Sequence, residues 1–239
     1  MTRPFIWAHR GTSARAPENT MAAFGLALEQ GVDGIELDIH LSQDGVPVVI
    51  HDETLARTTD GEGRIAEASW LELQQLDAGR WFSKVYAGEP IPPLESVLKT
   101  FGGLVRLNLE VKDFDAGMAV LDLLSGFPAA DVVVSSFNHD LLSQVRLQND
   151  KIPVAVLYDQ GNWYRALALA AQLRAIAFHP RATAVTRPMV AACKHLGLPV
   201  HAWTVDDPGL ARRLMRAGVT GFFANDPKAL KKAIPEELT

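Results

Sequence analysis

The chain has 239 residues, a length that suits either one α/β barrel or two smaller domains. Its composition, 48% hydrophobic and 21% charged, is that of an ordinary globular protein and excludes a chain that is disordered throughout. Lys and Arg number 23 against 28 Asp and Glu, for a net charge of −5, and no basic block occurs. A nucleic-acid partner or an anionic membrane surface therefore has no electrostatic support, and a bound phosphate would need a local site.

The cysteine content and the N-terminal pattern indicate the cellular compartment in which the protein is expected. Cys193 is the single cysteine, which excludes an internal disulfide and a cysteine-rich zinc site. The N-terminus runs directly into a strand-like segment without the pattern of a secretory leader. No segment approaches the ~20 apolar residues that a spanning helix needs. We therefore expect a cytoplasmic protein with no stable membrane insertion.

Short β-rich runs alternate with helical patterns along the chain. The expected strands are Phe5–His9, Gly34–Leu41, Val46–His51, Val105–Lys112, Asp131–Phe137, Pro153–Tyr158, Ala175–Pro180, Pro199–Val205 and Gly221–Asn225. The expected helices are, approximately, Asn19–Gln30, Ser69–Leu76, Leu94–Phe101, Asp115–Leu124, His139–Gln148, Trp163–Gln172, Arg187–Leu196 and Pro208–Ala217. This repeated strand-then-helix order predicts a parallel sheet.

One expected strand is in excess of the eight that a (β/α)8 barrel holds. The second and third strand candidates are joined only by a short turn that contains Asp44 and Gly45. Parallel neighbours need a crossover of a dozen residues or more, so these two strands must form an antiparallel hairpin. Asp38 is then expected roughly opposite His51. The remaining strands predict an α/β fold of the (β/α)8 TIM-barrel type.

The stretch from Asp52 to Gly103 is too long for an ordinary barrel crossover. It carries its own turns and a proline-rich passage at residues 89–93. We expect a single TIM-barrel domain over residues 1–239, with a small insertion after the second barrel strand at about residues 52–93. The helix Leu94–Phe101 would then lead back to the bottom of the barrel.

Carboxylates gather near the expected carboxyl ends of two neighbouring strands, where a TIM barrel places its active site. Glu36 and Asp38 point to the same face of their strand, and Glu110 has like parity on the neighbouring barrel strand. Three converging carboxylates repel one another, and a divalent cation such as Mg²⁺ or Ca²⁺ is the simplest remedy. An isolated pair of this kind would more often be solvated and paired with basic side chains. The apolar residues around Glu36 and Asp38 favour the cation site, because burying charges without a function is costly.

Two histidines and two basic residues are expected at the same end of the barrel. His9 ends the first strand and His51 ends the hairpin, so the two imidazoles could divide the work of general base and general acid at a phosphate. Arg10 and Lys112 could neutralise a phosphate oxyanion, and Glu18 could orient Arg10. The sequence has no Gly-rich phosphate loop and no Gly-x-Ser-x-Gly elbow, which disfavours nucleotide hydrolysis and serine acyl transfer.

Several other polar residues are weaker candidates. His179, at the end of the seventh barrel strand, could line the substrate pocket, with a hydrogen-bonded structural role as an equal alternative. A structural role is favoured for His201. His40 lies beyond the rim, where exposure in the hairpin is expected. Asn19 and Thr20 are typical of a helix N-cap.

These residues lie in motifs, spread in order over nearly the whole chain, that resemble the glycerophosphodiester phosphodiesterase family, in particular its small bacterial cytosolic type. The matching segments are His9-Arg10-Gly11, Pro17-Glu18-Asn19-Thr20, Gly34-Ile35-Glu36-Leu37-Asp38, Val48-Val49-Ile50-His51-Asp52, Leu55-Ala56-Arg57-Thr58-Thr59, Leu109-Glu110-Val111-Lys112, Ser135-Ser136-Phe137 and Trp203-Thr204-Val205. The roles that the resemblance implies are His9 and His51 as the acid/base pair, Glu36, Asp38 and Glu110 as ligands of one divalent cation, Arg10 and Lys112 for the phosphate, and Trp203 against the glycerol moiety.

The resulting hypothesis is a phosphoric diester hydrolase of lipid and glycerol metabolism. It would convert a small-molecule glycerophosphodiester into glycerol 3-phosphate and an alcohol, with one Mg²⁺ or Ca²⁺ ion. The alternatives are a phospholipase-type head-group hydrolase and a non-catalytic barrel that binds phosphodiesters. The sequence does not decide which histidine is the acid, whether water or a glycerol hydroxyl attacks, which head group is preferred, which metal is used, or the oligomeric state.

Overall fold

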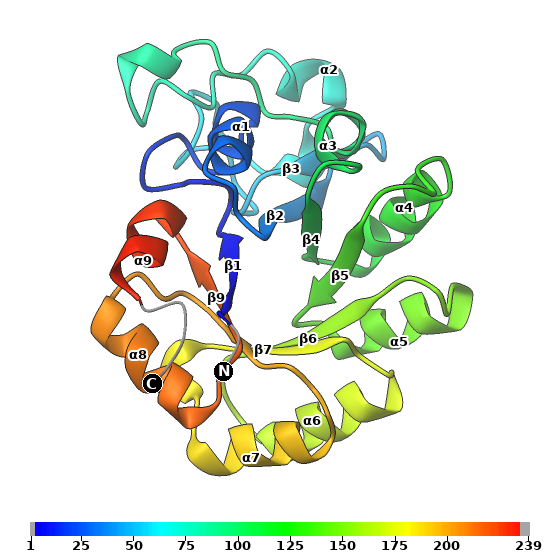
Figure 1. The fold of residues 1–239 in the computed structure, drawn as a ribbon. Coiled ribbons are helices and arrows are strands. Elements are labelled where there is room, and N and C mark those ends of the chain that lie inside the picture. The colour runs from blue at the N-terminus through cyan, green and yellow to red at the C-terminus, as the bar shows by residue number, and fades with distance from the viewer. Residues whose placement is uncertain (1–2, 235–239) are drawn as a thin grey trace.

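The structure, a computed structural model, describes residues 3–234 and contains a (β/α)8 barrel in that range (Figure 1). The parallel barrel strands are β1 (Phe5–Ala8), β2 (Gly34–Leu41), β4 (Arg106–Val111), β5 (Val132–Ser136), β6 (Val154–Tyr158), β7 (Ala177–Pro180), β8 (His201–Ala202) and β9 (Gly221–Ala224). Their order is β7-β6-β5-β4-β2-β1-β9-β8, and bridges between residues 178 and 200 and between 181 and 203 bring β7 beside β8. The predicted fold class is confirmed.

Helices surround the strands on the outside of the barrel (Figure 1). They are α1 (Met21–Glu29), α3 (Leu94–Phe101), α4 (Phe114–Leu124), α5 (His139–Gln148), α6 (Trp163–Gln172), α7 (Arg187–His195), α8 (Pro208–Ala217) and α9 (Pro227–Ala233). The sequence patterns did not predict α9, which is only seven residues long. Its start is marked by Asp226, which caps the helix through the backbone N–H of Ala229, and by Pro227 in the first turn.

Side-chain caps and apolar faces explain why the helices form where they do. In α8, Asp207 accepts a hydrogen bond from the backbone N–H of Leu210, and the helix ends at Gly218, whose φ of 103° is left-handed. The face of α8 that carries Leu214 and Met215 is buried. The same arrangement of a polar N-cap and one buried stripe recurs in α4, α5, α6 and α7.

A second apolar cluster fills the interior of the barrel. It consists of Trp7, Val133, Ala155, Ala177 and Phe223, and the rings of Trp7 and Phe223 are stacked with centroids 5.5 Å apart. The barrel interior below the carboxyl ends of the strands is therefore packed rather than open. Charged side chains from successive strands meet above this cluster, at the mouth.

The expected hairpin is present, although its register differs by one residue from the expectation. Strand β3 (Pro47–Val49) pairs antiparallel with β2, and Ile39 lies opposite Val49. The backbone carbonyl of Asp38 therefore accepts from the N–H of Ile50, and not of His51. His51 lies in the loop after β3.

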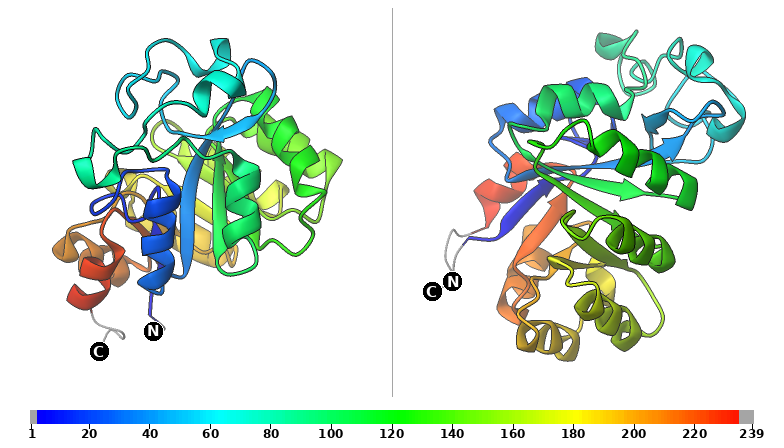
Figure 2. Two further views of the ribbon diagram at one scale, coloured as in Figure 1. Left: turned by 90° about the horizontal axis from the view of Figure 1, so that it is seen from above. Right: turned by 90° about the vertical axis from the view of Figure 1, so that its right-hand side faces the viewer.

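The segment between β3 and α3 contains the helix α2 (Trp70–Leu73) and the 3₁₀ turns η1 (Ile65–Glu67) and η2 (Lys84–Tyr86). It lies at one end of the barrel, beyond the end of β2 (cyan in Figure 2). A small apolar core of its own holds it together, formed by Val48, Ile50, Leu55, Ile65, Leu73, Ala78 and Ile91. That this insertion and the barrel make up one domain stays a prediction.

Within residues 3–234, no helix is long and apolar enough to cross a membrane. The expected cytoplasmic location stays a prediction.

Candidate active site

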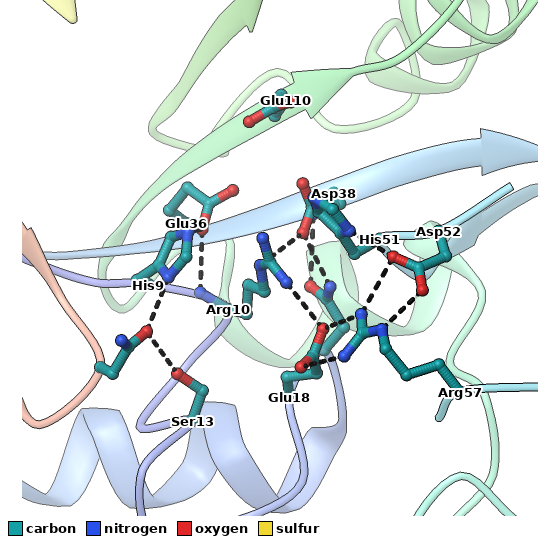
Figure 3. Close-up of polar contacts among 12 residues, drawn as sticks. His9, Arg10, Ser13, Glu18, Glu36, Asp38, His51, Asp52, Arg57 and Glu110 are labelled. Atoms are coloured by element: carbon teal, nitrogen blue, oxygen red, sulfur yellow. Dashed lines mark hydrogen bonds and ion pairs between the residues drawn. The ribbon is translucent and has the colours of Figure 1, made fainter. Parts of the chain in front are cut away.

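Three carboxylates from two adjacent strands meet at the mouth of the barrel (Figure 3). Parallel pairing of β2 with β4 sets Asp38 beside Glu110, and one oxygen of each of Glu36, Asp38 and Glu110 lies within 4.8 Å of the others. Glu36 and Asp38 are 2% and 1% exposed. One oxygen of Glu36, Oε1, is buried without a hydrogen-bond partner. An all-oxygen set with an unpartnered oxygen fits a hard divalent cation.

The electrostatics of this cluster follow from burial and crowding. Burial, reinforced by the charges of Asp38 and Glu110, raises the pKa of Glu36 well above its usual value. Burial and Asp38 likewise raise the pKa of Glu110. Burial opposes ionisation of Asp38 as well, but Lys112 and Arg10 outweigh it and lower its pKa. The protein thus holds one carboxylate ionised with its own basic side chains, and a cation would favour ionisation of the other two.

Lys112 and Arg10 both contact the cluster. The ammonium of Lys112 contacts Glu110 and lies 2.6 Å from Oδ1 of Asp38. Arg10 donates from its backbone N–H to Glu36 at 2.8 Å, and its Nε lies 3.3 Å from Asp38. Both basic side chains remain 18% exposed, so they can also face a ligand in the mouth.

The backbone that carries His9 and Arg10 into the mouth is a tight turn. Arg10 itself has a left-handed φ of 55°, and Gly11 follows with a φ of 77°. A Cβ on Gly11 would lie 2.7 Å from the backbone carbon of Ala23, so only glycine fits there. The His9-Arg10-Gly11 motif is thereby explained by close packing of this turn on the start of α1.

The imidazole of His9 is positioned by a hydrogen bond to the side-chain amide of Asn225. Its Nδ1 lies 2.7 Å from Oδ1 of Asn225, and Asp206 fixes the orientation of that amide by accepting from Nδ2 at 2.6 Å and from the backbone N–H at 2.7 Å. Ser13 also donates to the same amide oxygen. His9 therefore donates from Nδ1, which leaves a lone pair on Nε2, 4.0 Å from Glu36. Burial, followed by the charge of Arg10, lowers the pKa of His9 to about 4.

The imidazole of His51 is positioned by a hydrogen bond to the carboxylate of Asp52. Its Nδ1 lies 2.6 Å from Oδ1 of Asp52, and Arg57 holds the other oxygen of Asp52 at 2.5 Å (Figure 3). Arg57 also bonds Glu18 at 2.8 and 2.9 Å, and Glu18 accepts from Arg10 at 2.8 Å. The hydrogen bond from Arg57, opposed by partial burial, lowers the pKa of Asp52 to about 2. These contacts link His51 through Asp52, Arg57 and Glu18 to Arg10.

A cavity of about 310 Å³ opens between these groups. Its polar lining includes both histidines, Arg10 and Lys112, and its apolar lining is Phe137, Leu157, Trp203 and Phe223. The indole N–H of Trp203 donates to the backbone carbonyl of His179 at 2.8 Å, and the ring meets Phe137 edge-on with centroids 5.5 Å apart. The cavity lining thus combines charged and aromatic side chains.

The structure brings the predicted acid/base, cation and phosphate residues together, and places Trp203 in the cavity wall. His179 lies elsewhere: it is 0% exposed, outside the cavity lining, and stacked on His201 with ring centroids 5.6 Å apart. The expectation that His40 is exposed is wrong. His40 is 8% exposed and its Nε2 lies 2.9 Å from the carbonyl oxygen of His51, because the loop after β3 covers it.

The comparisons with known proteins agree with this geometry. The sequence model of the glycerophosphoryl diester phosphodiesterase family matches residues 9–229. The chain belongs to this family. A glycerophosphodiester phosphodiesterase of Caldanaerobacter subterraneus subsp. tengcongensis is 37% identical, with 95% of this chain and 96% of that protein aligned. One from Bacillus altitudinis is 34% identical over 98% of both chains. The predicted family and its enzyme class, phosphoric diester hydrolase, are confirmed.

Solved structures of the family share the fold over nearly the whole chain. A phosphodiesterase of Oleispira antarctica, in complex with the product sn-glycerol-3-phosphate, has a TM-score of 0.88 and 33% identity, with 97% of this chain and 96% of that chain covered. The glycerophosphodiester phosphodiesterase of Thermotoga maritima has a TM-score of 0.83 and 27% identity, with 97% and 99% covered.

Sequence reasoning missed the polar residues that support the family motifs. Thr20 is the N-cap of α1 as expected, but Asn19 instead donates to Asp38 at 2.8 Å and accepts from its backbone N–H. The sequence predicts no role in the site for Asn225 or Arg57. Asn225 directly follows a barrel strand, which is a usable signal, whereas Arg57 lies in the insertion, whose path the strand pattern does not predict.

Proposed function

We propose that the protein hydrolyses glycerophosphodiesters to glycerol 3-phosphate and an alcohol, with a divalent cation and with His9 and His51 as the acid/base pair. The observation that carries the proposal is that the two histidines share one cavity with buried carboxylates but have different partners, an amide for His9 and a carboxylate for His51. The related Oleispira antarctica phosphodiesterase in complex with sn-glycerol-3-phosphate supports the product.

Glu36, Asp38 and Glu110 would hold the cation, since they offer oxygen ligands and one of those oxygens has no partner. When bound, the cation would neutralise these carboxylates and polarise the phosphoryl group. Arg10 and Lys112, which both contact the cluster, would bind the non-bridging phosphate oxygens. Trp203 and Phe137 would pack against the glycerol carbons. His179, whose ring is enclosed, would act through its backbone carbonyl, which holds the indole of Trp203.

The different partners of the histidines give them different roles. His9 donates to a neutral amide oxygen, so its Nε2 lone pair is free to take a proton from the nucleophile, and His9 is the general base. His51 donates to Asp52, whose negative charge stabilises an imidazolium. Protonated His51 can then give its Nε2 proton to the leaving alkoxide as general acid. This arrangement serves attack by water and by the neighbouring glycerol hydroxyl equally well.

The test is an assay of the purified protein with glycerophosphocholine and glycerophosphoethanolamine, before and after chelation and after return of Mg²⁺ or Ca²⁺. Turnover should be lost on chelation and restored by the cation, and His9→Ala and His51→Ala should each reduce it by at least a hundredfold, in the ~10²–10⁴ range of acid/base catalysis. Turnover that survives complete cation removal, or variants that keep wild-type rates, would refute the mechanism. Binding of glycerol 3-phosphate without any turnover would instead indicate a non-catalytic barrel.

A further inference from the structure

Asn108 is a buried polar residue in the cavity that the proposed mechanism does not use. It lies on β4 two residues before Glu110, so both side chains face the barrel interior. Asn108 is 1% exposed and lines the cavity together with Leu157 and Phe223. A buried amide is costly unless its hydrogen bonds are satisfied.

Only half of this amide is satisfied. Its Nδ2 donates to Oγ of Ser135 at 3.0 Å, and Ser135 on the adjacent strand β5 is itself fully buried. Its Oδ1 is buried and has no hydrogen-bond partner among the described residues. The bond to Ser135 fixes the amide in the wall of the cavity and leaves its oxygen without a partner. The missing partner is a hydrogen-bond donor or a cation, and a substrate hydroxyl is one such donor.

The depth of Asn108 in the cavity indicates which substrate hydroxyl it would contact. Arg10 and Lys112, the proposed phosphate ligands, lie at the mouth beside Glu110 and Asp38. Asn108 lies two residues further down β4, level with Glu36 on β2 and about 7 Å below Glu110 along the strand. A glycerol moiety whose phosphate is held at the mouth would extend past the aromatic wall toward Asn108. Its hydroxyl farthest from phosphorus would arrive there first.

We infer that Asn108 is a specificity-determining residue whose Oδ1 accepts a hydrogen bond from the terminal hydroxyl of the glycerol moiety. The inference rests on the proposed function and deepens it, since it names the feature that separates a glycerol diester from other phosphodiesters. The carboxylates and histidines act on the phosphate that all these diesters share. Asn108 would therefore contribute to the choice of substrate and not to the chemical step common to them.

The experiment compares two substrates, glycerophosphocholine and its analogue in which the terminal glycerol hydroxyl is replaced by hydrogen. The measured quantity is the ratio of their kcat/KM values. The wild-type enzyme should prefer the natural substrate by about tenfold, the contribution of one hydrogen bond. Asn108→Leu and Asn108→Ala should bring the ratio close to one, mainly by loss of activity on the natural substrate. This ratio does not depend on the folded fraction of a variant, so partial misfolding cannot imitate the result.

Ser136→Ala is the matched control. Ser136 is also buried on β5, but its hydroxyl donates to the backbone carbonyl of Val111 and lies outside the cavity lining. This variant should keep the wild-type ratio. Titration of the Asn108 variants with Mg²⁺ or Ca²⁺ by calorimetry should give the wild-type affinity.

Three results would overturn the inference: an unchanged ratio in both Asn108 variants, an equal fall of the ratio in Ser136→Ala, or a loss of cation affinity large enough to account for the loss of activity. Failure of the proposed function is recognisable separately, because the wild-type enzyme would then turn over neither diester.

Discussion

Asp52→Asn should slow the hydrolysis of a glycerophosphodiester with a poor leaving group. The substitution keeps the size of the side chain but removes the charge that lies 2.6 Å from Nδ1 of His51. Hydrogen bonds to charged groups contribute about 1.5–3 kcal/mol. Because the Asp52 side chain is 27% exposed, solvent weakens the interaction, and a value of about 2 kcal/mol is appropriate. At 1.36 kcal/mol for each factor of ten, kcat should fall by about 30-fold.

The assay compares glycerophosphocholine with the p-nitrophenyl ester of glycerol phosphate. A p-nitrophenolate leaves without protonation, so a variant impaired only in the general acid should retain most of its kcat on this ester. Glu53→Gln is the matched control, because Glu53 carries the same charge in the same loop but pairs with Arg64, at 2.9 Å. If Asp52→Asn lost activity equally on both substrates, the assignment of His51 as general acid would be wrong.

Three further predictions follow from the structure. Burial lowers the pKa of His201 from 6.5 to about 4. Between these two pH values the unfolded chain binds a proton at His201 that the folded chain does not bind. The free energy of unfolding therefore decreases as the pH falls from about 6.5 to about 4. His201→Gln, which can still accept from Trp7 Nε1, should reduce the difference in unfolding free energy between pH 7.5 and pH 4.5 by about 2–3 kcal/mol in urea titrations, and an unchanged difference would contradict this assignment. Mg²⁺ or Ca²⁺ at 100 times its dissociation constant should stabilise the protein by about 2.7 kcal/mol in thermal unfolding, and Glu36→Gln should abolish most of this shift; a full shift in the variant would place the cation elsewhere. Gly11→Ala combines a left-handed φ with a clash against Ala23 and should cost about 2 kcal/mol or more, whereas Gly45→Ala, with φ 83° and open space around it, should cost about 1 kcal/mol; equal costs would show that the clash is absent.

The barrel could be predicted from the sequence because each strand and helix has a local pattern. The ranges of β2, α3, α5, α6 and α8 agree with the prediction residue for residue. Strand β8 was expected over Pro199–Val205 but has only two residues, since strand ends depend on pairing with neighbours that a local pattern does not contain. The exposure of His40 was mispredicted for a similar reason, because the carbonyl of His51 that contacts it lies in the loop after β3, whose path a local pattern does not contain.

The residues proposed for the cation and for acid/base catalysis could be predicted to lie together because they belong to, or lie close to the ends of, recognisable strands. The residues that hold these side chains in position could not be predicted. Asn225 lies 216 positions from His9, and Arg57 lies 39 positions from Glu18, so only the closed barrel and the folded insertion bring these pairs together. The difference between a neutral partner for His9 and a charged partner for His51, on which the roles depend, is therefore a tertiary property.

The central claim, cation-dependent hydrolysis of the bond between the phosphate and the alcohol, is tested most directly by ³¹P NMR of one reaction. Glycerophosphocholine is incubated with chelator-treated protein, and Mg²⁺ or Ca²⁺ is then added to the same sample. The account predicts no change before the addition, and afterwards conversion of the diester signal to that of glycerol 3-phosphate. Conversion without the cation, or formation of choline phosphate as the product, would contradict it.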